Sequence, residues 1–433
     1  MSGDAPSGPL ARFAPLRGDG RGWVLVTVAA GWFVTLGLRF VIPALLPRIK
    51  DGFGVDNAAA GLAVTLIWLT YAGMQLPAGA MVDRVGERRL LTASLLVAGI
   101  SLVAFGFVPT FGVFLLAGSL FGLGTGLFGP ARGTVLSNTF RENDGAAFGL
   151  TLAAGSVGAA ALPFVATQIS GRADGLLAGW AGWEIALASF APAFFVIAAG
   201  TWWAVPERDD RARSTAADDD TEEGTSRPSS DPQPDGGRTV RAVVDAATRR
   251  TVLVAAVGAV FMLFTFQGLT AFYTTYLVEQ KSLTPGTAGA LFALLFVAGA
   301  GFQSVAGRAA DRYGHGRVLV AISLIGVPPL VALPYVEGIV ALALLTVPIG
   351  VRLGVGPVVN AYVVAAIPPD VQGTTWGLVR TLFFALGSTG SVAVGVFADA
   401  GQFDLAMLGL AALTLPATAI FAVLPARRTE ATA

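Results

Sequence analysis

Residues 79–89 read GAMVDRVGERR, and residues 307–317 repeat the phrase as GRAADRYGHGR. The two copies keep the spacing of Gly79, Asp83-Arg84 and Gly86 at a distance of 228 residues. Landmarks outside the phrase follow the same offset within one residue: Gln75 with Gln303, and Gly129-Pro130 with Gly356-Pro357. A charged phrase that returns once in an apolar chain predicts two homologous halves.

The chain is too apolar for an ordinary soluble domain. Of its 433 residues, 54% are hydrophobic and 13% charged, against about 25% charged in soluble domains. Runs of about 20 apolar residues predict helices that cross a bilayer. Twelve segments qualify: 23–47, 60–82, 88–109, 111–138, 146–169, 183–205, 250–278, 285–310, 317–336, 338–366, 373–398 and 402–425. The expected fold is an all-α integral membrane protein with twelve transmembrane helices in two homologous six-helix bundles.

Polar stretches divide the chain into five regions. The acidic, Pro/Gly/Ser-rich stretch 206–249 cannot bury a core and predicts a disordered cytoplasmic linker, with a short surface helix expected at 238–250. The expected regions are a disordered leader (1–22), an N-terminal bundle (23–205), the linker (206–249), a C-terminal bundle (250–425) and a tail (426–433).

The basic residues predict the orientation in the membrane. An even number of spans puts both termini on one side, and short cytoplasmic loops carry an excess of Lys and Arg. With both termini in the cytoplasm, only four of the 28 basic residues fall in loops on the other side: Arg48, Lys50, Arg172 and Lys281. We therefore expect a multi-pass protein of the plasma membrane with cytoplasmic termini.

Several function classes are excluded by residue type. The chain has no cysteine, a single histidine (His315) and a net charge of zero, so neither a Cys- or His-rich metal site nor a nucleic-acid surface is expected. The sequence contains no GxxxxGK[ST] loop for ATP, and no nucleophile, metal cluster or acid pair lies in the spans. We expect no enzyme, no cofactor and no bound metal.

The duplicated phrase resembles the signature of the major facilitator superfamily, and the resemblance covers about 23–425. It implies a usually monomeric transporter that works by alternating access, with the phrase acting as a cytoplasmic latch. Gly79 would let a neighbouring helix approach closely. Gly316 replaces the arginine found at Arg88, which weakens the second copy. The latch residues are Gly79, Asp83, Arg84, Gly86, Arg88, Arg89, Gly307, Asp311, Arg312, Gly314 and Arg317.

Four arginines lie inside the spans, whereas every Asp and Glu of the spans lies near an end. Arg39 and Arg352 are too deep to reach the interface and favour a functional role. Arg132 and Arg380 lie closer to the cytoplasm, where snorkelling or a place in the latch are the alternatives. Buried cations without buried anions predict an anionic substrate, a carboxylate in preference to a phosphate ester.

Span 1 carries the most specific part of the expected site. Trp32, Thr35 and Arg39 share one helical face, and Arg39 begins RFVIPALLP, which resembles the first helix of the organic-anion branches of the superfamily. Span 7 has no matching arginine but offers Gln267 and Tyr273. Gln75 and Gln303 are either cavity donors or ligands of helix backbones.

The predicted function is secondary active transport of a small organic anion, in symport or exchange, with a proton or a counter-anion as coupling partner. A multidrug or metabolite efflux antiporter is the first alternative. The expected absence of deep acids and the spacing of Gly155, Gly158 and Pro163 in span 5 argue against it. A sensor on the same fold, which transports nothing, is the second alternative.

Overall fold

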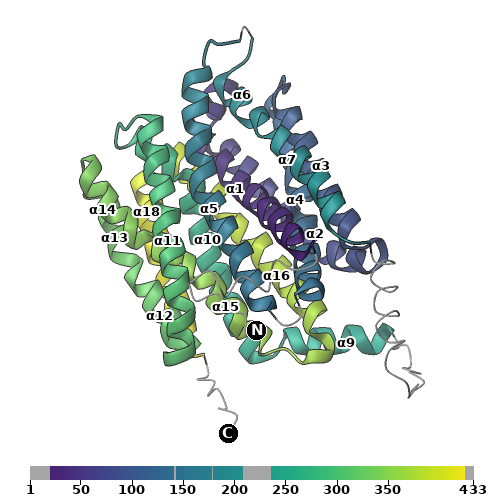
Figure 1. Ribbon diagram of the computed structural model, residues 1–433. Helices are drawn as coiled ribbons and strands as arrows, with labels where there is room; N and C mark the ends of the chain where they lie inside the picture. The colour runs from purple at the N-terminus through teal and green to yellow at the C-terminus, as the bar shows by residue number, and fades with distance from the viewer. Residues whose placement is uncertain (1–19, 141–142, 178, 208–235, 425–433) are drawn as a thin grey trace, which may run out of the picture.

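The computed structural model describes the chain except for residues 1–19, 141–142, 178, 208–235 and 425–433. All regular secondary structure in the described ranges is helical (Figure 1). Twelve helical stretches are long and apolar enough to cross a membrane. This confirms the predicted fold class and places six spans before the linker and six after it.

The first half contains seven helices. Their bounds are α1 Arg21–Phe53, α2 Asn57–Val85, α3 Glu87–Phe105, α4 Phe111–Thr139, α5 Asp144–Ala173, α6 Gly182–Ser189 and α7 Ala191–Ala204. The sixth span is therefore divided between α6 and α7. The break precedes Pro192, whose ring cannot follow a regular helical turn.

The second half begins after α9 Gly236–Ala247, which lies in the region where a surface helix was expected. Its spans use α10 Arg250–Glu279, α11 Pro285–Tyr313, α12 His315–Ile325, α13 Val327–Ala332, η3 Leu333–Tyr335, α14 Ile339–Ile349, η4 Gly350–Gly354, α15 Val355–Val364, η5 Pro369–Val371, α16 Gln372–Ser388, α17 Gly390–Asp399 and α18 Phe403–Ala422. The sequence gives spans 9, 10 and 11 as one apolar segment each, and the structure divides each of them into shorter helices.

The interruption of span 10 matters most for the site. Pro348 and Pro357 flank η4, and each removes a backbone donor from the α-helical pattern. The five residues between α14 and α15 consequently wind as a 3₁₀ helix, and Arg352 is in this segment. A tighter turn of this kind inside a span is a recurrent mark of functional positions.

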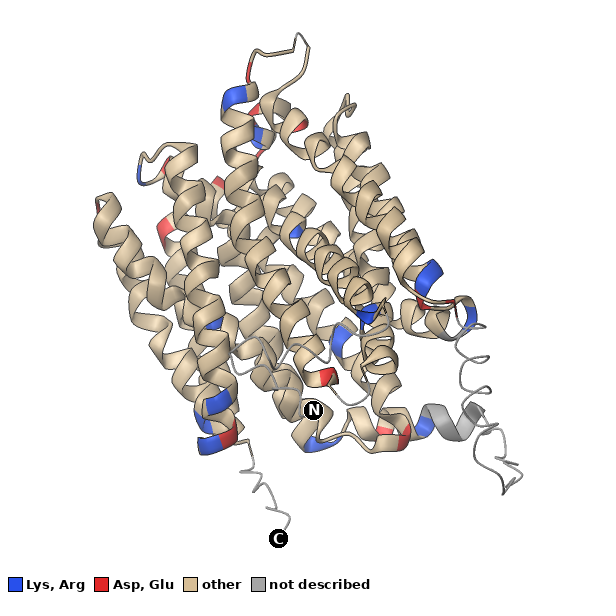
Figure 2. Cartoon of the chain, in the orientation of Figure 1, with Lys and Arg blue, Asp and Glu red and all other residues tan. Residues whose placement is uncertain are grey.

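The spans run between two ends of the bundle, which we name by their contents. The linker side is the end where α9 lies, crosswise to the spans (Figure 1). The far side is the end where α1 finishes and α2 begins. Charged residues gather near both ends, with few in the middle of the bundle (Figure 2).

The two halves are joined tightly on the far side. The Asp399 carboxylate, at the end of α17, accepts hydrogen bonds from the backbone N–H groups of Asn57 (2.8 Å) and Ala58 (2.7 Å), which begin α2. Lys50 of α1 forms an ion pair with Glu279 of α10. We call these contacts the far-side clamp. A carboxylate at a helix N-terminus is stabilised by the unsatisfied N–H groups and the helix dipole.

Glycines let the helices pack without gaps. A Cβ at Gly122 would meet the Ile67 backbone, and one at Gly158 would meet the Phe33 backbone, so α4 lies directly on α2 and α5 on α1. Between the halves, Gly61 of α2 lies against the backbone of Ser391 in α17. Small residues at these positions bring helix axes close, which is the main source of packing energy in a bilayer.

Candidate functional site

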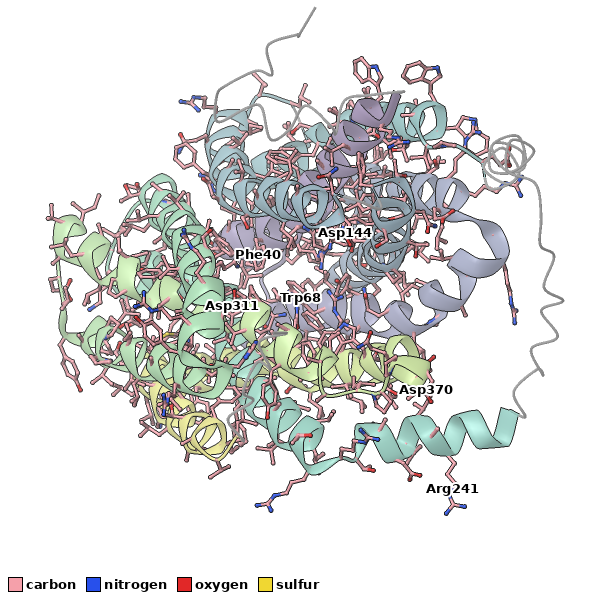
Figure 3. The ribbon with its side chains drawn as sticks, turned by 60° about the horizontal axis from the view of Figure 1, so that its bottom comes forward. Phe40, Trp68, Asp144, Arg241, Asp311 and Asp370 are labelled. Carbon is pink, nitrogen blue, oxygen red and sulfur yellow. The ribbon has the colours of Figure 1, made fainter. Side chains whose placement is uncertain are left out.

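A cavity of about 230 Å³ lies between the two halves. Its walls come from α1, α2 and α5 of the first half and from α10, α11, η4, α15 and α16 of the second. Phe40 and Trp68, two of its lining residues, lie near the centre of the bundle when it is seen from the linker side (Figure 3). The cavity is therefore at the position where a transporter built from two repeats holds its substrate.

Arg352 faces this cavity from the 3₁₀ turn η4. Its Nη2 donates to the hydroxyl oxygens of Thr265, by a short contact, and of Thr414, at 2.9 Å. The side chain is 3% exposed, and its Nε and Nη1 atoms are buried without a hydrogen-bond partner. A buried cation with free donors is costly unless an anion completes it. The deep arginine is thus held by two hydroxyl groups, while its two other donor atoms are enclosed without a partner.

Arg39 is buried behind the cavity wall instead of lining it. Its guanidinium carbon lies 4.1 Å from the ring centroid of Tyr71, 5.2 Å from that of Trp68 and 5.5 Å from that of Trp32. Its Nε donates to the backbone carbonyl of Thr35 at 3.0 Å. Aromatic faces stabilise the cation in the absence of a carboxylate. Arg39 therefore contributes charge to the site from the second layer of side chains.

Arg380 and Arg132 lie close to the same tyrosine. Arg380 lines the cavity, and its Nη2 donates to the Tyr71 hydroxyl across the boundary between the halves at 3.3 Å. Arg132 donates to the Thr151 hydroxyl at 3.2 Å, and its guanidinium carbon lies 4.2 Å from the Trp32 ring centroid. Both interact electrostatically with Arg39 and with Tyr71. Neither has snorkelled to the membrane surface.

The balance of charge at the cavity is entirely positive. Arg352 and Arg380 line it, Arg39 and Arg132 lie behind it, and no carboxylate is found among the described lining residues. Like charges in a medium of low dielectric repel one another strongly. A negative ligand would relieve this repulsion and accept hydrogen bonds from the free guanidinium donors.

The other expected binding residues are divided between the cavity and the scaffold. Gln303 lines the cavity. Its repeat partner Gln75 donates through Nε2 to the Gly126 carbonyl at 3.2 Å, so in the first half the backbone-binding alternative applies. Trp32 packs on Phe128 with ring centroids 6.2 Å apart, and its Nε1 atom is buried without a partner.

Three more of the expected residues lie outside the cavity lining, as Arg39, Trp32 and Gln75 do. The Thr35 hydroxyl donates to the Gly31 carbonyl of its own helix at 2.8 Å. The Tyr273 hydroxyl bonds the Thr346 hydroxyl at 2.5 Å, inside the second half. Gln267 is 1% exposed, with both amide atoms unpartnered and outside the cavity lining. Helical spacing placed Trp32, Thr35 and Arg39 on one face of span 1 but did not give the depth of each side chain, and none of the three lines the cavity.

Sequence reasoning missed the polar-aromatic face of α2. Trp68 and Tyr71 share a helix face with Gln75, at spacings of three and four residues, and this face is directed toward the arginines. Asn360, one turn beyond Gly356-Pro357, and Ser156 of α5 also line the cavity. The spacing in α2 was a usable signal, because it repeats the pattern that singled out Trp32, Thr35 and Arg39.

The first copy of the repeated phrase connects α2 to α3. Gly86 has φ +87°, which favours glycine, and it forms the N-terminal cap position of α3. Arg89 pairs with Glu207 at 2.5 Å, and Arg88 lies 3.9 Å from the same carboxylate and over the Trp202 ring. Both arginines therefore bind the end of α7 in their own half. Arg84 is exposed, and the Asp83 side chain lies outside the described residues.

The second copy connects α11 to α12 in the same way. Gly314 has φ +90° and precedes α12, whereas Asp311, Arg312 and Arg317 are exposed. Gly316 stands where the first copy has an arginine. A Cβ built on Gly316 would lie 3.4 Å from the Cβ of Leu424, so the chain just after α18 leaves little room for a side chain here.

One expectation about the phrase is wrong for this conformation. Gly79 was expected to admit a neighbouring helix, but a Cβ at this position, as at its repeat partner Gly307, would meet nothing within 4 Å. Gly79 and Gly307 therefore face open space on the linker side, while the far side is clamped.

Comparisons with known proteins agree with this architecture. The family profile described as Major Facilitator Superfamily matches residues 27–391 and, in a second match, 255–433. An uncharacterized MFS-type transporter, YfnC of Bacillus subtilis (strain 168), is 23% identical over 401 residues, which cover 93% of this chain and 92% of that protein. Multidrug resistance protein MdtH of Yersinia pestis (strain Pestoides F) is 30% identical over 178 residues, 40% of this chain and 41% of that protein.

A solved structure shares the fold over almost the whole chain. It is a bacterial homolog of the human lysosomal transporter Spinster, in an inward-facing and unoccupied conformation, with a TM-score of 0.77 and 16% sequence identity. The alignment covers 94% of this chain and 97% of that one.

Proposed function

Since the chain belongs to the Major Facilitator Superfamily and is a multi-pass membrane transporter, we propose that it carries a small organic anion by alternating access. The observation that carries this proposal is the charge of the central cavity. Arg352 and Arg380 line the cavity, and Arg39 and Arg132 add positive charge behind it. An anion with a carboxylate would supply the missing partner for the free Nε and Nη1 of Arg352.

The arrangement of the two halves supports the alternating-access part. The far-side clamp holds α1 and α2 against α10 and α17, and Gly79 and Gly307 face open space on the linker side. One face closed and the other free is the expected end state of a rocking movement about a central site. In this proposal the reverse state releases the clamp and brings the two glycine-bearing phrases together as the latch.

The distribution of basic residues supports a proposal for the location and orientation of the protein. We place the linker side, with both chain ends, in the cytoplasm and the protein in the plasma membrane, because few basic residues occupy the far-side loops. A monomer suffices, since the cavity is built from one chain.

Coupling to an ion gradient requires a carrier of charge other than a buried acid. The described lining residues include no Asp or Glu. Two schemes fit: symport, in which a proton enters with the anion, and exchange, in which a second anion leaves by the same site. Both use the arginines as the fixed positive partner and need no metal and no cofactor.

The main alternative is multidrug efflux. The relative MdtH carries the name of a multidrug resistance protein, and the cavity has a large apolar surface. Lipophilic cations, however, would enter a cavity whose described charges are all positive, which costs Coulomb energy at low dielectric. Efflux of neutral or anionic drugs is compatible with the cavity, whereas efflux of cations is disfavoured.

Transport by the purified protein in liposomes tests the proposal. Vesicles loaded with an unlabelled carboxylate should accumulate the same labelled carboxylate, and Arg352→Ala should abolish the uptake. Arg308→Ala is the matched control, because Arg308 is an exposed arginine of α11 that does not line the cavity. Uptake of lipophilic cations that is indifferent to Arg352 would establish the efflux alternative. Binding of the anion without any uptake would establish a sensor.

A further inference from the structure

The wall of the cavity is mostly aromatic. We call this surface the aromatic wall, and it consists of Phe40, Trp68, Phe266, Phe296, Phe383 and Phe384. Leucine, methionine and valine side chains fill most of the remaining lining. A cavity that served only a small hydrophilic anion would leave this apolar surface without a partner.

The rings contact one another across the boundary between the halves. Phe40 of α1 lies 4.5 Å from Phe296 of α11 and 6.3 Å from Phe266 of α10, measured between ring centroids. Phe384 of α16 lies parallel to Trp68 of α2, with an interplanar angle of 2° and centroids 5.7 Å apart. A further aromatic ring would meet both offset-stacked and edge-on partners here.

Two arginines, Arg352 and Arg380, are among the described residues that line this cavity. Arg352 lines the cavity from η4 and has two buried donor atoms without a partner, and Arg380 lines it from α16. The uncharged polar groups of the lining are Ser156, Gln303 and Asn360. Groups that can donate hydrogen bonds to a carboxylate therefore line the same cavity as the aromatic wall.

The volume limits the size of the occupant. An engineered cavity of about 150 Å³ holds a benzene molecule. A cavity of about 230 Å³ therefore accommodates one or two fused rings with one carboxylate. When Arg352 and Arg380 both bind the first carboxylate, a second one would find no further cation among the described lining residues, and its charge would stay uncompensated.

We propose that the substrate is an aromatic monocarboxylate, held by Arg352 and Arg380 through the carboxylate and by the aromatic wall through its ring. This inference rests on the proposed function, because it specifies the anion that the same cavity carries. It differs from the general anion proposal in one respect: the ring contributes to binding as much as the charge does.

Three probes separate charge from ring. The dissociation constants of 2-naphthoate, 2-naphthamide and succinate are measured with the detergent-purified full chain. We expect 2-naphthoate to bind at least 10-fold more tightly than either of the others. Comparable binding of naphthoate and naphthamide would overturn both proposals, because the charge would then be irrelevant. Tight binding of succinate with weak binding of naphthoate would overturn this inference and leave the anion proposal intact. Failure of both anions to bind at millimolar concentration would overturn both.

A pair of variants tests the wall itself. Phe266→Leu keeps an apolar residue of similar size but removes a ring from the wall, and we expect it to weaken naphthoate binding about 3- to 10-fold. Succinate binding should change by less than 2-fold. Phe264→Leu is the matched control, since Phe264 belongs to the same helix but does not line the cavity. If the two variants weakened naphthoate binding equally, the ring of the ligand would not contact the aromatic wall.

Discussion

Replacing Arg380 with glutamine removes a cavity-lining charge at the boundary between the two halves. The residue is half-buried, and its Nη2 donates to the Tyr71 hydroxyl at 3.3 Å. Glutamine keeps a donor of similar reach but no charge. In the proposed transporter this change removes one of the two guanidinium groups that would bind the substrate carboxylate.

The size of the effect follows from the burial of the pair. Truncating one partner of a buried charge pair costs about 2–5 kcal/mol. Because Arg380 is only half-buried, we use the lower part of this range, about 2.7 kcal/mol. This energy corresponds to a dissociation constant about 100-fold larger. A ligand at 100 times its dissociation constant stabilises the native protein by about 2.7 kcal/mol, and the same concentration would stabilise the variant by about 0.4 kcal/mol.

Thermal unfolding in detergent, with and without 2-naphthoate, measures both quantities. The empty variant should be as stable as the parent or more stable, because Arg380 repels Arg39 and Arg132 in the unoccupied site. Tyr71→Phe is the control, since it removes the neutral bond partner and leaves the cation free to bind. A variant that loses stability when empty and keeps the full ligand shift would refute the reasoning and make Arg380 a structural tie.

Three further predictions follow from contacts elsewhere in the bundle. Asp399→Asn should weaken the far-side clamp by about 1 kcal/mol. A cysteine placed at buried Thr274 should then react about 5-fold faster with an impermeant maleimide that is added from the far side. An unchanged reaction rate would contradict the clamp. Gly158→Ala should destabilise the protein by about 1–3 kcal/mol, because its Cβ would meet helix backbone, whereas Gly301→Ala, which meets nothing within 4 Å, should not lower the unfolding temperature. Thr414→Val removes a 2.9 Å hydrogen bond from the guanidinium of Arg352. This change should weaken substrate binding about 5-fold and have little effect on the maximal transport rate. Unchanged binding would show that this hydrogen bond does not position Arg352.

The fold could be predicted because bilayer physics leaves few solutions for a chain of this composition. Each run of about 20 apolar residues must satisfy its backbone internally and therefore forms a helix. The breaks inside spans 9, 10 and 11 could not be placed in the same way. Proline is common in membrane helices without interrupting them, as Pro43 and Pro47 do not interrupt α1. Only packing decides which proline ends a helix.

The sequence predicts that deep arginines form the candidate site, but not which side chains line the cavity and which lie behind its wall. The sequence reveals that Arg39 and Arg352 are deep, because their distance from the span ends is set by chain length. It does not reveal that the guanidinium of Arg39 lies against three aromatic rings, since these come from two helices, α1 and α2. Likewise, Gln75 and Gln303 are equivalent by repeat, yet only one of them faces the cavity. Equivalent positions diverge once each half has its own neighbours.

The contrast between Gln75 and Gln303 has a consequence for selectivity. Most cavity-lining residues belong to the second half, whereas Arg39 and Arg132, which act from behind the wall, belong to the first. Substitutions in the second half can therefore change the lining while the arginines behind the wall in the first half stay the same. In the proposed transporter, changes in α10, α11 and α16 alone would alter selectivity against this constant electrostatic background.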